Sequence, residues 1–269
     1  MLKFYFFLAF FWKINSYGQT VDTITIYSVA MKTASKCIVI KPAGYKKKNN
    51  FYPAIYLLHG YDGRYDNWIT KMLSLKYYAS FFNTLIICPD GGFSSWYINS
   101  PLDNSQYETY MLEVVKYIDM NYKTIKDRNH RAITGLSMGG YGAFMLAIKH
   151  SEIFGAAGSM SGAMDLKEIA TKYDLMKRLG DTIHYAEQWK KYSVLNITDT
   201  FKSRLKLLFD CGTRDGFING NRALHIKLMK RSVAHDYIER DGGHSWNYWI
   251  NALPYHLLFF RKYFDEPGL

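Results

Sequence analysis

The sequence GLSMG at positions 135–139 constrains the fold of this chain more than any other stretch. It is the chain's only match to G-x-S-x-G, and it lies between an apolar segment and a helix-like run from 140 to 149. This context predicts a serine on a sharp turn between a strand and a helix. Residues two before and two after the serine must lack bulk there, and both are glycine. Ser137 is therefore a candidate nucleophile that needs a base, an acid and oxyanion donors from elsewhere in the chain.

The first 18 residues have the pattern of a secretory signal peptide. Lys3 gives a positive start, residues 4–12 are wholly apolar, and Ser16 and Gly18 are small residues before a possible cleavage point. Nine apolar residues are far fewer than the roughly 20 that a membrane span requires. A first core strand is the other interpretation. We expect a secreted or periplasmic protein whose residues 19–269 form one domain, since chains of this length commonly do.

The charge pattern gives little support for a polyanionic partner. Removing residues 1–18 takes away Lys3 and Lys13 and lowers the formal net charge from +11 to +9. The remaining lysines are scattered, and the one tight run, 46–48, adjoins two asparagines and is typical of a solvated turn. We therefore expect no nucleic-acid partner, and no stable membrane insertion after signal cleavage.

Cysteine usage says little about the cellular compartment, and the usual metal-binding motifs are absent. Cys37, Cys88 and Cys211 each lie in or beside an apolar segment, so buried free thiols are expected. There is no CxxC pair and no HExxH motif, so the sequence predicts neither a metal site nor a cofactor.

Strands and helices are expected to alternate along the mature chain. Strands are predicted at 23–29, 36–40, 54–58, 84–88, 156–160, 205–209 and 237–239, and helices at 68–79, 106–120, 140–149, 219–230 and 246–264. The first two strands are expected to form an edge pair, and 165–200 to form an insertion over the site. The alternation predicts an α/β fold with a mostly parallel central sheet, helices on both faces, and ligands beyond the carboxyl ends of the strands.

Two loops at predicted strand ends supply catalytic partners for the serine. Asp215 follows the strand 205–209, and His244 follows the strand 237–239. The order Ser137, Asp215, His244 is the order found in α/β-hydrolases. The histidine would take the serine proton and later give it to the leaving alcohol, while the aspartate would hold the imidazole tautomer.

Other residues compete for these roles. Asp210 ends the strand 205–209 and is the alternative acid, whereas Asp241 lies too close to His244 in sequence to reach around its ring. His59 is the alternative base, but it precedes the serine and ends the strand that usually supplies an oxyanion donor. We therefore interpret His59 as shaping that loop.

Oxyanion and substrate contacts are expected beside the triad. The backbone amides of Met138 and Tyr61 are the predicted oxyanion donors. Trp96, Tyr97 and Trp246 lie near the predicted site loops and could stack on a sugar or an aromatic acyl group. The chain is 17% aromatic, so packing in the core or on the surface is an equally good interpretation of these three.

Five motifs together resemble one family over most of the mature chain. LLHGYDG, SWYINSPLDNSQYETY, GLSMGG, CGTRDG and GGHSWNYW are similar to those of the esterase D-like group of α/β-hydrolases. That group includes feruloyl and acetyl xylan esterases, S-formylglutathione hydrolases, tributyrin esterases and the antigen 85 mycolyltransferases. The resemblance implies Ser137 as nucleophile, Asp215 as acid, His244 as base, and Tyr61 and Met138 as oxyanion donors.

The resemblance and the predicted export together imply a serine carboxylic-ester hydrolase that acts through an acyl-enzyme and needs no cofactor. Its expected substrates are short-acyl esters or acetyl and feruloyl esters linked to polysaccharides. The alternatives are a thioesterase similar to S-formylglutathione hydrolase, an acyltransferase of the antigen 85 type, and a non-catalytic binding protein on the same fold, since fold alone does not fix a substrate.

Overall fold

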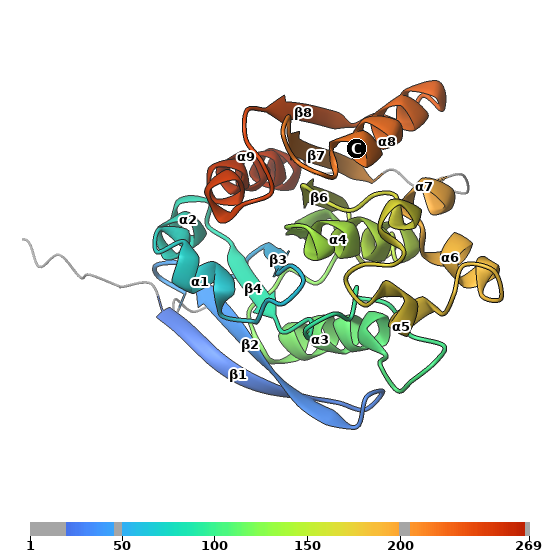
Figure 1. Ribbon diagram of the computed structural model, residues 1–269. Coiled ribbons are helices and arrows are strands. Elements are labelled where there is room, and N and C mark those ends of the chain that lie inside the picture. The colour runs from blue at the N-terminus through green and yellow to red at the C-terminus, as the bar shows by residue number, and fades with distance from the viewer. Residues whose placement is uncertain (1–19, 46–49, 199–204, 267–269) are drawn as a thin grey trace, which may run out of the picture.

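The computed structural model describes residues 20–45, 50–198 and 205–266 (Figure 1). The predicted signal peptide, residues 1–18, and the lysine run at 46–48 lie outside these ranges.

The described strands form a single eight-stranded sheet in the order β1-β2-β4-β3-β5-β6-β7-β8. β2 is antiparallel to both of its neighbours, and every other neighbouring pair is parallel. The α/β class and the edge pair β1 and β2 are thus confirmed. The bounds are β1 (Thr20–Ser28), β2 (Thr33–Lys41), β3 (Ala54–Leu58), β4 (Leu85–Pro89), β5 (Arg131–Gly135), β6 (Ala156–Met160), β7 (Lys206–Gly212) and β8 (Asp236–Arg240).

Helices cover both faces of the sheet, which explains why β3 to β6 are buried along their whole length (Figure 1). One face packs against α3 (Tyr107–Asn121), α4 (Met138–Lys149) and α8 (Ile218–Lys230). The other packs against α1 (Asn67–Lys71), α2 (Leu75–Phe81) and α9 (Trp246–Asp265). Alternate residues of β3 follow this division: Tyr56 and Leu58 belong to the first apolar cluster, Ile55 and Leu57 to the second.

The helix expected at 68–79 is interrupted. Met72 has φ −126° and ψ 85°, outside the helical region, and the chain restarts as α2 after Ser74. The break allows Trp68 and Met72 from the first piece, and Leu75 from the second, to be buried together in one cluster. Periodicity predicts that these residues are buried, but it does not predict the break at Met72.

The predicted insertion forms short helices with no strand in its described part, residues 165–198. It contains η2 (Leu166–Ile169), α5 (Leu175–Leu179), α6 (Ala186–Tyr192) and α7 (Val194–Ile197). The insertion reaches the site through Tyr173, as described below.

The described residues also bear on the predictions about cysteines and membrane spans. Cys37, Cys88 and Cys211 are buried free thiols, as the apolar surroundings predicted. In the ranges that the structure covers, no helix combines the length and apolar character needed to cross a bilayer.

Candidate active site

Ser137 occupies the turn between β5 and α4. Its backbone has φ 54° and ψ −118°, a conformation that is strained for a residue other than glycine and that commonly marks a functional position. The Ser137 amide donates to Met160 O on the neighbouring strand, at 2.9 Å. The turn places the serine at the carboxyl end of β5, where ligands of parallel sheets bind.

The glycine at 139 permits the tight approach of helix to strand that this turn requires. A Cβ atom at Gly139 would lie 2.5 Å from His59 O and 2.7 Å from Leu58 O, both backbone atoms that cannot swing away. Two residues before the serine, a Cβ at Gly135 would lie 2.7 Å from the Gly139 backbone. The predicted demand for small residues at both positions is confirmed.

Gly139→Ala is expected to destabilise the protein by about 1 to 3 kcal/mol, because an added methyl would force backbone apart in a close-packed turn. Gly216→Ala is the matched control, since a Cβ at Gly216 meets nothing within 4 Å. Urea unfolding of both variants measures the difference. Equal midpoints for the two variants would contradict this account of the turn.

The structure brings together the three residues predicted to form the triad. His244 Nε2 lies 2.9 Å from Ser137 Oγ, and His244 Nδ1 lies 2.9 Å and 3.1 Å from the two carboxylate oxygens of Asp215. The imidazole is held edge-on between the rings of Phe217 and Trp249, at centroid distances of 4.8 Å and 4.9 Å. This is the nucleophile, base and acid arrangement of serine hydrolases.

Asp215 is buried but remains suited to carry a negative charge. Burial alone would raise its pKa, but the hydrogen bond and charge of His244, together with the amide of Phe217, outweigh burial and lower the pKa below its usual value. An ionised Asp215 accepts the His244 Nδ1–H and leaves Nε2 free to accept the serine proton.

The rival residues have other partners. The Asp210 carboxylate is fully buried and is bonded by Tyr248 and His256, while Asp241 pairs with Arg214. Neither aspartate contacts His244, so the geometry favours Asp215 as the acid.

His59 is buried in the loop after β3, and its two ring nitrogens are both occupied. Its Nε2 accepts from the Gly91 amide at 2.7 Å, which leaves Nδ1 to donate to Gly60 O at 2.8 Å. Burial lowers its pKa, consistent with a neutral ring in this pair of bonds. His59 therefore shapes the loop that carries Tyr61, in agreement with its interpretation from the sequence.

Two backbone amides are available beside the serine. Met138 is the first residue of α4, where N–H groups have no acceptor within the helix. Tyr61 lies in the loop beside the serine, where a Cβ at Gly60 would be 3.4 Å from Ser137 Cβ. Within the described residues, neither amide donates to a protein acceptor. Both are therefore free to donate to an oxyanion formed at Ser137.

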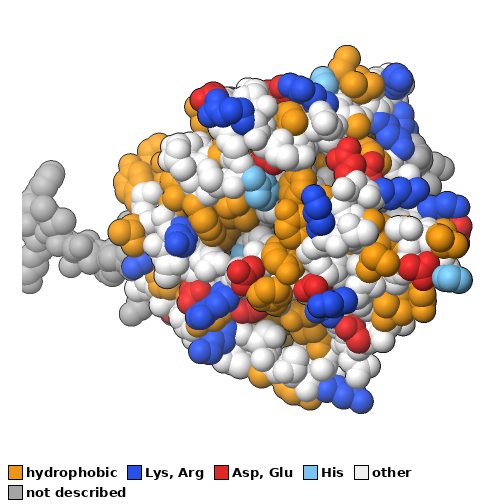
Figure 2. Space-filling model, viewed as in Figure 1, with side chains coloured by type: hydrophobic (Ala, Val, Ile, Leu, Met, Phe, Trp, Pro, Cys, Tyr) orange, Lys and Arg blue, Asp and Glu red, His pale blue; other side chains and the backbone are white. Residues whose placement is uncertain are grey.

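A cavity of about 530 Å³ opens at Ser137 and His244. Figure 2 shows a hollow near the centre of this face, bordered largely by hydrophobic side chains and with a histidine at its rim. Aromatic side chains come from three parts of the chain: Tyr61 from the loop after β3, Tyr173 from the insertion, and Trp246 and Trp249 from α9. The cavity can therefore hold an apolar or planar group next to the nucleophile.

The model of the esterase family, described as "Putative esterase", matches residues 28–260. This chain belongs to that family. Its serine, histidine and aspartate have the geometry described above, on the α/β-hydrolase fold.

Individual relatives of this esterase are distant. It is 26% identical over 234 residues to an esterase of Mycobacterium tuberculosis, an alignment that covers 77% of this chain and 51% of the relative. The chain thus spans about half the length of that protein. It is 27% identical over 260 residues to an acetyl esterase of Caldicellulosiruptor saccharolyticus, covering 86% and 94% of the two chains. A solved ferulic acid esterase is similar with a TM-score of 0.79 and 27% identity, covering 92% of this chain and 99% of that one.

Two residues expected to contact substrate in this esterase do not line the cavity. Trp96 and Tyr97 are 1% and 0% exposed and are absent from the cavity wall, so the expectation of stacking on a substrate is corrected for both. Both have positive φ, 53° and 56°, and this turn directs them into the core. Trp96 Nε1 donates to Tyr173 O, and Tyr97 OH donates to His59 O. Trp96 and Tyr97 therefore pack behind the residues that line the cavity.

Trp246 does line the cavity, together with two aromatic residues that the sequence interpretation missed. Trp249 lies one helical turn after Trp246, and this i, i+3 spacing at the start of α9 was a signal for it. Tyr173 gave no such signal, because it lies in an irregular segment with φ 55°.

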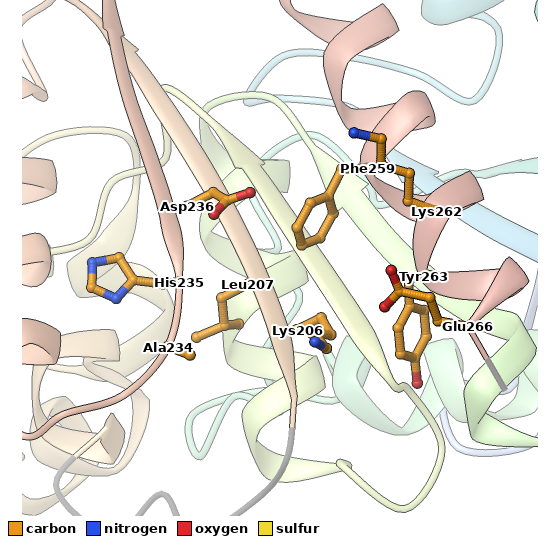
Figure 3. A pocket seen from close by; sticks show the side chains of 9 residues that line it. All are labelled: Lys206, Leu207, Ala234, His235, Asp236, Phe259, Lys262, Tyr263 and Glu266. Carbon is orange, nitrogen blue, oxygen red and sulfur yellow. The ribbon is translucent and has the colours of Figure 1, made fainter. Parts of the chain in front are cut away.

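A second hollow of about 260 Å³ lies at the opposite end of the sheet, where β7 and β8 begin (Figure 3). Its lining residues are Lys206, Leu207, Ala234, His235, Asp236, Phe259, Lys262, Tyr263 and Glu266. These residues include neither serine nor cysteine, and the one hydroxyl among them, that of Tyr263, donates to Asn129. The candidate catalytic residues line the other cavity, at Ser137 and His244.

Proposed function

We propose that this protein is an exported esterase that acts, through an acyl-enzyme, on short-acyl esters or on acetyl and feruloyl esters linked to polysaccharides. The observation that carries the proposal is the 2.9 Å contact between His244 Nε2 and Ser137 Oγ inside a cavity with aromatic walls. Hydrolysis of p-nitrophenyl acetate is the first test, because a non-catalytic binding protein on this fold would give no turnover.

The proposed acylation begins with attack of Ser137 Oγ on the ester carbonyl while His244 Nε2 takes the hydroxyl proton. The carbonyl oxygen becomes an oxyanion, which accepts hydrogen bonds from the amides of Tyr61 and Met138. Removing one such donor typically costs about 100- to 1,000-fold in rate, or roughly 2.7 to 4 kcal/mol. The intermediate then breaks its bond to the alcohol oxygen, and His244 returns the proton to the departing alcohol.

Deacylation repeats these steps with water in place of the serine hydroxyl. His244 removes a proton from water as the water attacks the acyl carbonyl, and it then protonates Ser137 Oγ as the acid leaves. Asp215 holds Nδ1–H throughout and stabilises the imidazolium that forms twice in each cycle.

The cavity supports a preference for short or planar acyl groups. Its walls include two tyrosine and two tryptophan rings, which favour a planar acyl group or a sugar face. The similarity to an acetyl esterase and to a ferulic acid esterase supports the same substrate classes.

Turnover is expected to peak at acetyl to butyryl esters and to fall with longer chains. Complete burial of a methylene stabilises binding by about 0.8 kcal/mol. Leu136 is the one aliphatic residue in the cavity lining that the structure describes, so a long acyl chain gains little apolar contact there. Measuring kcat/KM for p-nitrophenyl esters of increasing chain length tests this expectation. A steady rise through octanoyl and decanoyl esters would indicate a lipase-like or mycolyltransferase-like site instead.

The natural ester can be identified with a parallel panel of acetylated xylan, feruloylated oligosaccharide, tributyrin and S-formylglutathione. The proposal predicts that one of the polysaccharide-linked esters gives the highest kcat/KM. Preference for S-formylglutathione would establish the thioesterase alternative. Formation of a new ester in the presence of an added alcohol, faster than release of the acid, would establish acyl transfer.

Export is expected to remove the first 18 residues by cleavage between Gly18 and Gln19. The basis is the charged start, the short apolar core and the small residues at 16 and 18. N-terminal sequencing of the protein from its native host measures this directly. Recovery of an intact Met1 from the cytosolic fraction would contradict export and would favour a thioester of glutathione as substrate.

A further inference from the structure

Four buried polar side chains close to the triad form a hydrogen-bonded network. They take no part in the proposed proton transfers. Thr134 Oγ1 lies 3.0 Å from His256 Nδ1, and His256 Nε2 lies 2.7 Å from Asp210 Oδ2. Tyr248 OH donates to the other carboxylate oxygen of Asp210 at 2.8 Å. All four side chains are buried.

The strands and the helix joined by this network are the ones next to the triad residues. Thr134 lies on β5, which leads into Ser137, and Asp210 lies on β7, which leads into Asp215. Tyr248 and His256 lie on α9, which begins two residues after His244. The buried hydrogen bonds therefore fix β5, β7 and α9 relative to one another directly below the reacting atoms.

Tyr248 also contacts the loop that presents His244. A Cβ at Gly242 would lie 2.7 Å from Tyr248 Cδ2, so the tyrosine ring packs directly against this glycine, whose φ is 143°. The same loop is bonded to the segment leading to Asp215, because the Arg214 amide donates to Gly242 O at 2.9 Å. A shift of the Tyr248 ring would therefore move the loop that holds His244.

Asp210 is suited to hold Tyr248 and His256 in fixed positions. A buried carboxylate is tolerated only when it is paired and hydrogen-bonded. Arg240 Nη1 lies 3.3 Å from Asp210 Oδ2, and the Arg240 guanidinium lies 4.3 Å from the centroid of the Tyr255 ring. Because both carboxylate oxygens of Asp210 have partners, rotation of the carboxylate would break its hydrogen bonds to Tyr248 and His256.

We propose that Asp210 is a positioning residue for ester hydrolysis. It acts through Tyr248 and His256, which hold α9 and the His244 loop in the register that keeps Nε2 within 2.9 Å of Ser137 Oγ. The inference rests on the proposed hydrolysis by the Ser137 triad. A misplacement of about 1 Å is enough to cost about 100-fold in rate.

Tyr248→Phe tests the proposal, because it removes the hydroxyl bonded to Asp210 and keeps a ring against Gly242. The expected result is a fall in kcat for p-nitrophenyl acetate of about 10- to 100-fold with little change in KM. Rates are expressed per active site, counted by titration with diethyl p-nitrophenyl phosphate, so unfolded protein does not contribute.

Tyr263→Phe is the matched control. It makes the same substitution in the same helix, but the Tyr263 hydroxyl donates to Asn129 at 3.2 Å, away from the His244 loop. Its kcat is expected to equal that of the wild type. If Tyr248→Phe lowers only the unfolding temperature and leaves kcat at the wild-type value, Asp210 has a structural role alone and the proposal is wrong.

A double variant tests the route through Asp210. Asp210→Asn added to Tyr248→Phe should cost less in kcat than the product of the two separate losses, because both changes break one connection. Multiplicative losses would overturn the proposed route. Absence of turnover in the wild type would instead defeat the proposed function, and the positioning role with it.

Discussion

Ser137→Ala and His244→Ala are each expected to reduce kcat for p-nitrophenyl acetate by at least about 10,000-fold, since members of a triad act as a unit. Without Oγ there is no atom to form the acyl-enzyme. Without Nε2 there is no base 2.9 Å from that oxygen. The double variant should be little worse than either single one, because each already removes the same covalent step.

Two exposed residues provide matched controls for these substitutions. Ser74 precedes α2 without a side-chain capping bond, and the side chain of His184 is 81% exposed. Ser74→Ala and His184→Ala are expected to keep wild-type kcat. Retention of more than a tenth of the wild-type rate by Ser137→Ala would remove Ser137 as the nucleophile.

Asp215→Asn is expected to lower kcat by up to about 10,000-fold while the fold is retained, because an amide favours the wrong imidazole tautomer. Asp210→Asn should cost less in kcat and more in stability, since it removes the charge that pairs with Arg240 and replaces one of the two oxygens that accept from α9 with an amide nitrogen. The comparison uses kcat per titrated active site and urea unfolding for both variants. A greater loss of kcat in folded Asp210→Asn would assign the acid role to Asp210.

The fold was predictable because apolar runs and turn residues alternate clearly along the chain. The strands at 54–58 and 156–160 match the sequence prediction residue for residue. The first is a continuous apolar run, as expected of a strand buried on both faces. The loops bearing Ser137, Asp215 and His244 follow from the same pattern, because parallel strands place their carboxyl ends at one edge.

The walls of the cavity were less predictable. A loop aromatic can face a ligand or the core, and composition does not distinguish the two. Trp96 and Tyr97 turn inward because both have positive φ, a property that no local residue pattern signals. Tyr173 reaches the cavity through packing of the insertion against segments distant in sequence, which include Trp96 and Tyr61. Such long-range contacts decide side-chain direction independently of periodicity.

The proposed positioning role of Asp210 could likewise not be predicted from local sequence. Its sequence position makes it the alternative candidate for the acid, since it precedes Asp215 at the end of the same predicted strand. Its partners Tyr248 and His256 come from a helix 38 and 46 residues later in the chain, so these contacts of Asp210 are seen only in the three-dimensional structure.

The central claim is that Ser137 forms a covalent intermediate with the substrate, activated by His244. Diethyl p-nitrophenyl phosphate tests it directly, because an activated serine displaces p-nitrophenolate and keeps the phosphoryl group. Mass spectrometry of the digested protein should find one adduct per chain, on the peptide that contains Ser137, and none in Ser137→Ala. An adduct on a different residue, or undiminished p-nitrophenyl acetate turnover by a protein that takes up no phosphoryl group, would contradict the account.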